Sequence, residues 1–95
     1  MKLAMISFTD HGSSLCARLT GLLADRGWDC ESYAVRKYAG KYGLKELDRS
    51  LCEWTGTVFG SRDAIVFIGA TGIAVRAIAP WVQDKKSDPA VVVMD

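Results

Sequence analysis

The chain has no excess of charge of either sign, which argues against a nucleic-acid partner. Its 12 Lys and Arg residues against 11 Asp and Glu give a formal net charge of +1 at pH 7. Such a charge creates no global field that would attract a polyanion. Basic residues do gather within residues 36–45, together with two tyrosines, but no nucleic-acid-binding motif accompanies them. We therefore interpret this cluster as a solvated helix face.

Cysteine and histidine are too few and too scattered for a metal centre or a disulfide framework. Cys16, Cys30 and Cys52 are odd in number, form no CxxC pair and have no histidine partner at ligand spacing. We expect them to be small buried hydrophobic residues in a protein of the reducing cytoplasm. The sequence therefore predicts no protein-bound metal.

The sequence also lacks an apolar run that fits a membrane span or a secretion signal. The run Leu3–Phe8 is too short for either, and the apolar region 65–82 is interrupted by Arg76 and Pro80. We expect a cytoplasmic protein without a membrane partner. A hydrophobic content of 49% with 24% charged residues instead fits one small globular domain, and residues 1–95 are predicted to form a single α/β domain.

Segments of strand and helix character alternate along the chain. A leucine stripe ending at Gly27 predicts the first helix, which Ser13 or Ser14 could cap. Leu44, Leu47, Leu51, Trp54 and Val58 are spaced as one face of a second helix, and Pro80 should end the third near Ala79. Strands are predicted at 2–8, 28–35, 64–68 and 90–94, with helices at 14–26, 44–58 and 72–79.

This alternation predicts a small open parallel sheet of the Rossmann or flavodoxin-like class. We expect four strands in the order 2-1-3-4, with helices on both faces. Charged residues blur the alternation within 28–35, so that strand is placed at an edge. The run of small and β-branched residues at 90–94 is typical of a central parallel strand.

The turn Gly69-Ala70-Thr71-Gly72 is the most informative feature, because it connects a buried strand directly to a helix. Unpaired amides and the dipole at a helix N-terminus favour anions there. Thr71 is the expected N-cap, and Arg76, one turn inside, could add a positive charge. Either glycine could equally serve only the turn and close packing. Arg76 could instead pair with an acidic residue.

A second loop, Thr9-Asp10-His11-Gly12, should meet this turn at the carboxyl edge of the sheet. In open α/β sheets ligands bind at this edge, where the winding direction reverses. Asp10 and His11 are the titratable side chains placed beside that crevice early in the chain, and they are the candidate catalytic residues. A lone loop histidine is more often only a solvent-exposed residue. The predicted ligand-binding residues are Thr9, Gly12, Gly69, Ala70, Thr71, Gly72 and Arg76.

The wording FIGATGIAVRAIAP, followed by a polar stretch and DPAVVVMD, resembles the N-terminal region of the cobalt-precorrin-5A hydrolase family. The opening MKLAMISFTDHG resembles it more loosely. The resemblance implies opening of the lactone ring of cobalt-precorrin 5A and release of acetaldehyde to give cobalt-precorrin 5B, in anaerobic cobalamin biosynthesis. It also implies that this chain is the N-terminal part of a longer protein, whose remainder completes the pocket and is its partner. Cobalt would arrive with the substrate, and no cofactor is expected.

An alternative function is a flavodoxin-like module that binds a phosphate or nucleotide, or another protein, without hydrolysis. In that case the loop from Thr9 to Ser14 would cradle a phosphate, as in FMN sites. The loop lacks the hydroxyl-rich T-x-T-G-x-T pattern, and no aromatic loop is present for an isoalloxazine ring to stack on.

Overall fold

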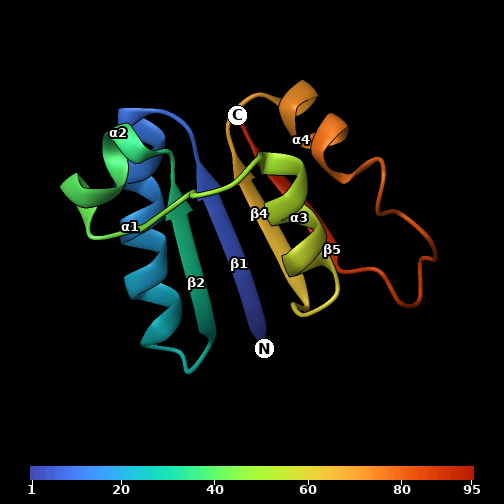
Figure 1. Ribbon diagram of the computed structural model, residues 1–95. Helices are drawn as coiled ribbons and strands as arrows, with labels where there is room; N and C mark the ends of the chain where they lie inside the picture. The colour runs from blue at the N-terminus through green and yellow to red at the C-terminus, as the bar shows by residue number, and fades with distance from the viewer.

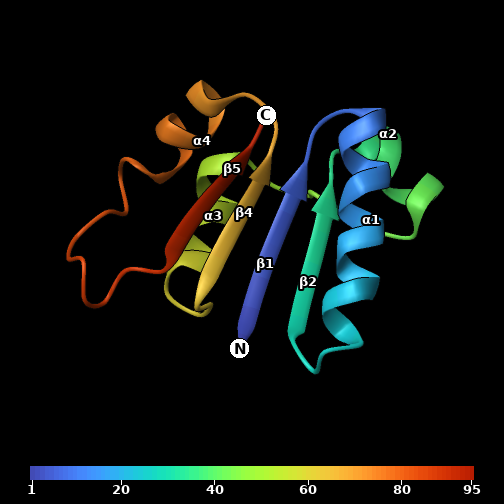
Figure 2. The same ribbon diagram turned by 180° about the vertical axis from the view of Figure 1, so that it is seen from behind.

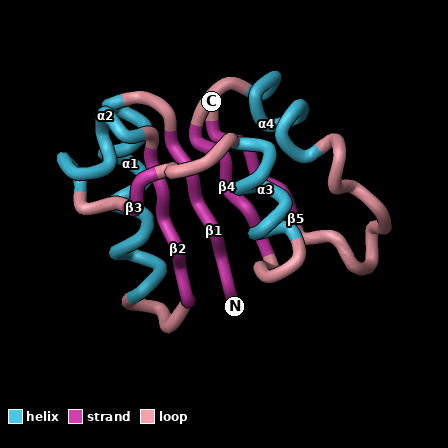
Figure 3. The backbone as a smooth tube through the Cα atoms, viewed as in Figure 1, coloured by secondary structure: helices cyan, strands magenta, loops and turns pink.

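The computed structural model describes residues 1–95 and shows a parallel sheet with helices on both faces (Figure 1). A long loop connects α4 to β5 at one end of the sheet (Figure 3). The elements, in chain order, are β1 (Lys2–Ser7), α1 (Asp10–Ala24), β2 (Asp29–Ala34), α2 (Arg36–Ala39), the 3-10 helix η1 (Gly40–Tyr42), β3 (Lys45–Glu46), α3 (Leu51–Phe59), β4 (Ala64–Ile68), α4 (Thr71–Ile78) and β5 (Ala90–Met94).

The sheet contains five strands in the order β3-β2-β1-β4-β5, all parallel. The prediction of four strands is wrong, because a short strand, β3, is added beside β2; the four predicted strands keep their predicted relative order. Tyr33 and Ala34 pair with Lys45 and Glu46, and the amide of Leu47 donates to Ala34 O at 2.9 Å. β2 is consequently an internal strand and not the edge strand that its charged residues suggested.

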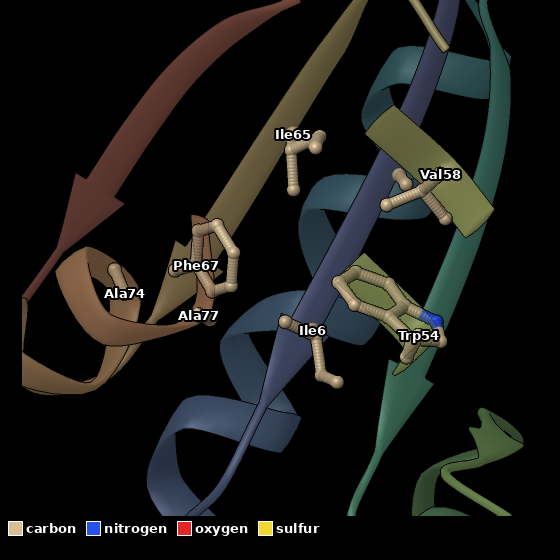
Figure 4. Packing of buried hydrophobic residues seen from close by; sticks show 8 residues of the cluster. Ile6, Trp54, Val58, Ile65, Phe67, Ala74 and Ala77 are labelled. Atoms are coloured by element: carbon tan, nitrogen blue, oxygen red, sulfur yellow. The ribbon is translucent and has the colours of Figure 1, made fainter. Parts of the chain in front are cut away.

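The helices divide between the two faces, as the front and back views show (Figures 1 and 2). On one face α1 covers Leu3, Met5 and Val66. On the other, α3 and α4 pack on the alternate strand residues. Figure 4 shows this second cluster, in which Ile6, Ile65, Phe67, Trp54, Val58, Ala74 and Ala77 point toward one another. Successive side chains of each strand point to opposite faces of the sheet, so the strands contribute to two separate cores.

The first helix starts earlier than its leucine stripe predicted. α1 begins at Asp10, and its N-cap is Thr9, whose side chain accepts from the amide of Gly12 at 3.0 Å. Ser13, an expected cap, is instead buried, with its Oγ 3.0 Å from Ser7 Oγ. Beyond the end of α1, Gly27 adopts a left-handed φ of 81°, which explains why glycine stands there.

The second helix is shorter than predicted. α3 begins at Leu51, and Ser50 caps it by accepting from the amide of Glu53 at 3.1 Å. Leu44 and Leu47 lie outside the helix and pack on the two cores from the segment around β3. Spacing alone placed them on a helix face, because it could not detect the strand pairing with β2.

Two further expectations need correction. Cys16 is buried, but Cys30 is only half-buried and Cys52 is exposed. β5 is an edge strand, and its side chains alternate between partly buried and exposed, so it is not a central strand. None of the helices combines the length and apolar character needed to cross a membrane.

Candidate functional site

A cleft of about 450 Å³ opens at the carboxyl edge of the sheet. It lies where β1 and β4 run side by side and their following helices depart to opposite faces. This is the reversal point at which open α/β sheets bind ligands. The predicted site residues that line it are Thr9, His11, Gly12, Gly69 and Ala70. We call this space the carboxyl-edge cleft.

Two glycines allow the walls of this cleft to come together. A Cβ at Gly12 would lie 2.9 Å from Thr9 Oγ1 and 3.3 Å from Ile68 Cγ2. A Cβ at Gly69 would lie 2.9 Å from Phe8 Cδ2. Neither glycine has a positive φ. Close approach, and not backbone freedom, is therefore what requires glycine at both positions.

At the N-terminus of α1, the N-cap residue Thr9 accepts hydrogen bonds from two backbone amides of the first turn. Gly12 N donates to Thr9 Oγ1 at 3.0 Å, and Ser13 N donates to Thr9 O at 2.8 Å. Asp10 adds a carboxylate in the same first turn. The amides of Asp10 and His11 make no hydrogen bond, but the Asp10 carboxylate beside them makes this helix end less favourable for an external anion.

The N-terminus of α4 differs, because it has no side-chain cap. Ala70 is the N-cap residue, and Thr71 is the first helical residue, so the prediction that Thr71 caps this helix is wrong. Ala70 has an extended backbone, with φ −65° and ψ 136°, so the helix begins one residue earlier than predicted. No hydrogen bond is made by the amides of Thr71 and Gly72. Both residues are exposed and lie beside the carboxyl-edge cleft without lining it.

Arg76 is exposed and forms no ion pair with Asp10, Asp95 or any other carboxylate. Its Nη1 lies 3.9 Å from the position of a Cβ on Gly72, so the guanidinium reaches back toward the first turn of α4. It does not line the carboxyl-edge cleft. A free positive charge therefore stands next to the uncapped helix end, outside the cleft proper.

The two candidate catalytic residues have different surroundings. His11 is exposed at the rim of the carboxyl-edge cleft. Asp10 points away from it, and its Oδ1 accepts from Tyr42 OH at 2.7 Å and Lys41 Nζ at 2.9 Å. The hydrogen bonds from Tyr42 and Lys41 lower the pKa of the Asp10 carboxyl. A lowered pKa makes a carboxylate a weaker base.

Other residues of the cleft were not among the predicted binding residues. Leu15 of α1, together with Ile68 and Met94 at the ends of their strands, forms its apolar part, and Asp95 adds a carboxylate. The last residue of each parallel strand is the sequence signal that could have identified Ile68 and Met94. The structure holds no cluster of three or more potential metal-ligating side chains.

Comparisons with known proteins agree with the resemblance in the sequence. The family described as Cobalamin synthesis G N-terminal matches residues 53–95. A cobalt-precorrin-5A hydrolase of Salmonella typhimurium is 38% identical over 93 residues, which is 98% of this chain and 25% of that protein. One of Priestia megaterium is 31% identical over 92 residues, which is 97% of this chain and 25% of that protein.

No solved structure matches the chain at a significant level. The chain spans about a quarter of the length of these curated relatives, and the aligned part covers β1 through β5. Both the GATG turn and the cleft residues of β4 and β5 fall within the stretch that the family matches. The chain is therefore related, over nearly its whole length, to the N-terminal region of the cobalt-precorrin-5A hydrolase family.

Proposed function

We propose that this chain is the N-terminal domain of a cobalamin-biosynthesis hydrolase, and that it binds the acidic macrocycle cobalt-precorrin 5A. The full-length protein would open the lactone ring and release acetaldehyde to give cobalt-precorrin 5B. Cobalt would enter as part of the substrate. The observation that carries the proposal is the uncapped N-terminus of α4, where the amides of Thr71 and Gly72 and the side chain of Arg76 are free of partners.

The chemistry of the substrate supports this location. A carboxylated macrocycle needs several fixed donors for its acidic groups, and a charge-assisted hydrogen bond contributes roughly 1.5–3 kcal/mol. The free amides of α4 and Arg76 are such donors. The apolar residues Leu15, Ile68 and Met94 in the adjoining cleft offer a surface for the ring itself.

Lactone hydrolysis also needs a base that activates water and donors that stabilise the developing oxyanion. The amides at the start of α4 suit the second role. His11, at the cleft rim, remains the candidate base in this chain, whereas the pKa of Asp10 is lowered by Tyr42 and Lys41. We propose that the remainder of the full-length protein supplies further catalytic groups.

The alternative, phosphate binding at the first loop, finds less support. An FMN-type cradle needs free amides at the start of α1, where Thr9 Oγ1 already accepts from Gly12 N and the Asp10 carboxylate adds a negative charge. A purified protein that carries FMN would be yellow. A colourless protein that retains a corrin precursor would favour the proposed function.

Arg76→Ala tests the binding site directly. We expect about a tenfold loss of affinity for cobalt-precorrin 5A, because one charge-assisted contact is removed, and no change in thermal stability, because Arg76 is exposed and unpaired. The measurement is the corrinoid absorbance that elutes together with the protein on gel filtration. Lys86→Ala, an exposed cation in the loop after α4, is the matched control. Unchanged affinity of the Arg76 variant would reject the anion-binding role.

A further inference from the structure

A second cleft lies on the α3 face, beside β2 and β3, and shares no lining residue with the carboxyl-edge cleft. It has a volume of about 340 Å³ and is bounded by β2, β3 and α3. We call it the α3 cleft. Its walls include Tyr33, Lys45, Arg49, Trp54, Thr57 and Val58, and none of these lines the carboxyl-edge cleft. Nothing in the proposed function uses it.

One residue that lines this cleft, Trp54, carries a buried donor without an acceptor. Trp54 is only 3% exposed, and its Nε1 has no hydrogen-bond partner. In Figure 4 the indole nitrogen lies on the side turned away from Phe67, toward β2. Leaving such a group unsatisfied costs about 1–3 kcal/mol. Trp81 shows the ordinary arrangement, because its Nε1 donates to Cys52 O at 3.1 Å.

The charges of the α3 cleft are already compensated. Glu31 Oε1 lies 2.7 Å from Arg62 Nη2 and 3.5 Å from Lys45 Nζ. Asp48 Oδ1 lies 3.3 Å from Arg49 Nε, and Glu46 pairs with Arg36 at 3.8 Å. A charged guest would have to break one of these pairs. The cleft therefore favours a guest without net charge.

The neighbouring hydroxyl groups are also engaged as donors. Thr57 Oγ1 donates to Glu53 O at 3.1 Å, and Ser61 Oγ donates to Thr57 O at 3.0 Å. Tyr33 OH donates to Glu31 Oε2 at 3.3 Å. The N–H of Trp54 is thus the donor that still needs an acceptor, while Tyr33 and Val58 provide an apolar wall.

We propose that the α3 cleft binds a small uncharged molecule that presents a carbonyl oxygen, such as a carboxamide, to the Trp54 N–H. The apolar part of the ligand lies against Tyr33 and Val58. Lys45 and Arg49, whose side chains are 59% and 48% exposed, move aside to admit it. This binding site is independent of the proposed function at the carboxyl-edge cleft.

Proton–nitrogen correlation spectra of the indole groups test the proposal. The chain has 3 tryptophans, and Trp28→Phe and Trp81→Phe assign the Trp54 resonance by elimination, without altering the core residue itself. The probes are benzamide, benzoate and benzylammonium, which share one shape and differ in charge. We expect a saturable shift of the Trp54 resonance by benzamide, with the Trp81 resonance unmoved, and binding of both charged probes weaker by about fivefold or more.

Two variants test the location. Thr57→Arg, on the exposed side of α3, should fill the cleft and abolish the benzamide shift. Val75→Arg, which adds the same charge on exposed α4, should leave it intact. If benzamide caused no saturable shift of the Trp54 resonance, the Trp54 N–H would have water or the Tyr33 ring as its acceptor. That result would overturn the proposal. Benzoate binding as tightly as benzamide would overturn the assignment of an uncharged ligand.

Discussion

Gly69 and Gly72 lie in one turn but meet different surroundings. A Cβ at Gly69 would lie 2.9 Å from the Phe8 ring, whereas a Cβ at Gly72 meets only Arg76 Nη1 at 3.9 Å. The first position is thus constrained by packing. The second is not, which leaves ligand approach as the role available to Gly72.

We therefore expect opposite results from two alanine substitutions. Gly69→Ala should lower the free energy of unfolding by about 1–3 kcal/mol, because the added methyl overpacks the contact with Phe8. Gly72→Ala should leave it unchanged or raise it by up to about 1 kcal/mol, since alanine favours a helix, and should weaken corrinoid retention. Urea denaturation measures the first effect and gel filtration with the substrate the second. Equal destabilisation by both would contradict this division.

Asp10 makes stability depend on pH through Tyr42 and Lys41. Their hydrogen bonds lower the pKa of its carboxyl in the folded state. A lowered pKa stabilises the fold above the ordinary value and loses this contribution as the pH falls through the lowered value. Asp10→Asn should therefore be less stable than the native chain at pH 7, and the difference should shrink below about pH 4.

The measurement is urea denaturation of both proteins between pH 7 and pH 2. Asp25→Asn, at the far end of α1, is the matched control, because Asp25 forms no ion pair. A difference for Asp10→Asn that stayed constant with pH would show that the carboxylate charge is irrelevant to its bonds with η1.

Among the helices, α3 contacts the segment that follows α4 through the indole ring of Trp81. A Cβ at Gly56 would lie 2.5 Å from Trp81 Cζ2, and Trp81 Nε1 donates to Cys52 O. The glycine lets the ring lie flat on the helix surface. This contact helps to hold α4 beside the carboxyl-edge cleft.

Two glycines inside helices should consequently respond differently to alanine. Gly56→Ala should destabilise the protein by about 1–3 kcal/mol, because the methyl displaces Trp81. Gly21→Ala, on exposed α1 with nothing within 4 Å of the added Cβ, should stabilise it by about 0.5–1 kcal/mol. Thermal unfolding of both variants is the measurement. Stabilisation by Gly56→Ala would show that the Trp81 contact contributes little.

At the scale of the whole molecule, the helices cover the sheet unevenly. Figure 2 shows α1 on the β2 side of the sheet, while β5 lies in front at the other side with no helix over it. Val92 and Met94 are accordingly 47% and 36% exposed. Met94 also lines the carboxyl-edge cleft, so the cleft is open on the side of this uncovered strand.

We expect the isolated chain to bind cobalt-precorrin 5A without releasing acetaldehyde, and a form extended to the full length of its relatives to release it. The reason is that, of the two candidate catalytic residues, only His11 lines the carboxyl-edge cleft. The measurement is acetaldehyde formed during incubation of each form with the substrate. Turnover by the isolated chain would show that residues 1–95 contain the catalytic set.

Much of the fold follows from local pattern. The β-branched run of β4, the glycine turn after it and the leucine stripe of α1 predicted their elements, because burial on one face imposes a period on the sequence. The strand β3 escaped prediction, since its two residues carry no period and exist only through pairing with β2. Leu44 and Leu47 flank this strand, and their spacing predicted a helix because the pairing with β2 could not be seen in the sequence.

By itself, the sequence determined the parallel α/β class and the meeting of two glycine-bearing loops at one edge, because side-chain periodicity and turn chemistry are local properties. How each helix is capped depended on tertiary packing. Thr9 Oγ1 accepts from Gly12 N at the start of α1, while α4 begins at Thr71 without a side-chain cap. The capping of a helix depends on where its first turn falls, and packing against the rest of the sheet decides that.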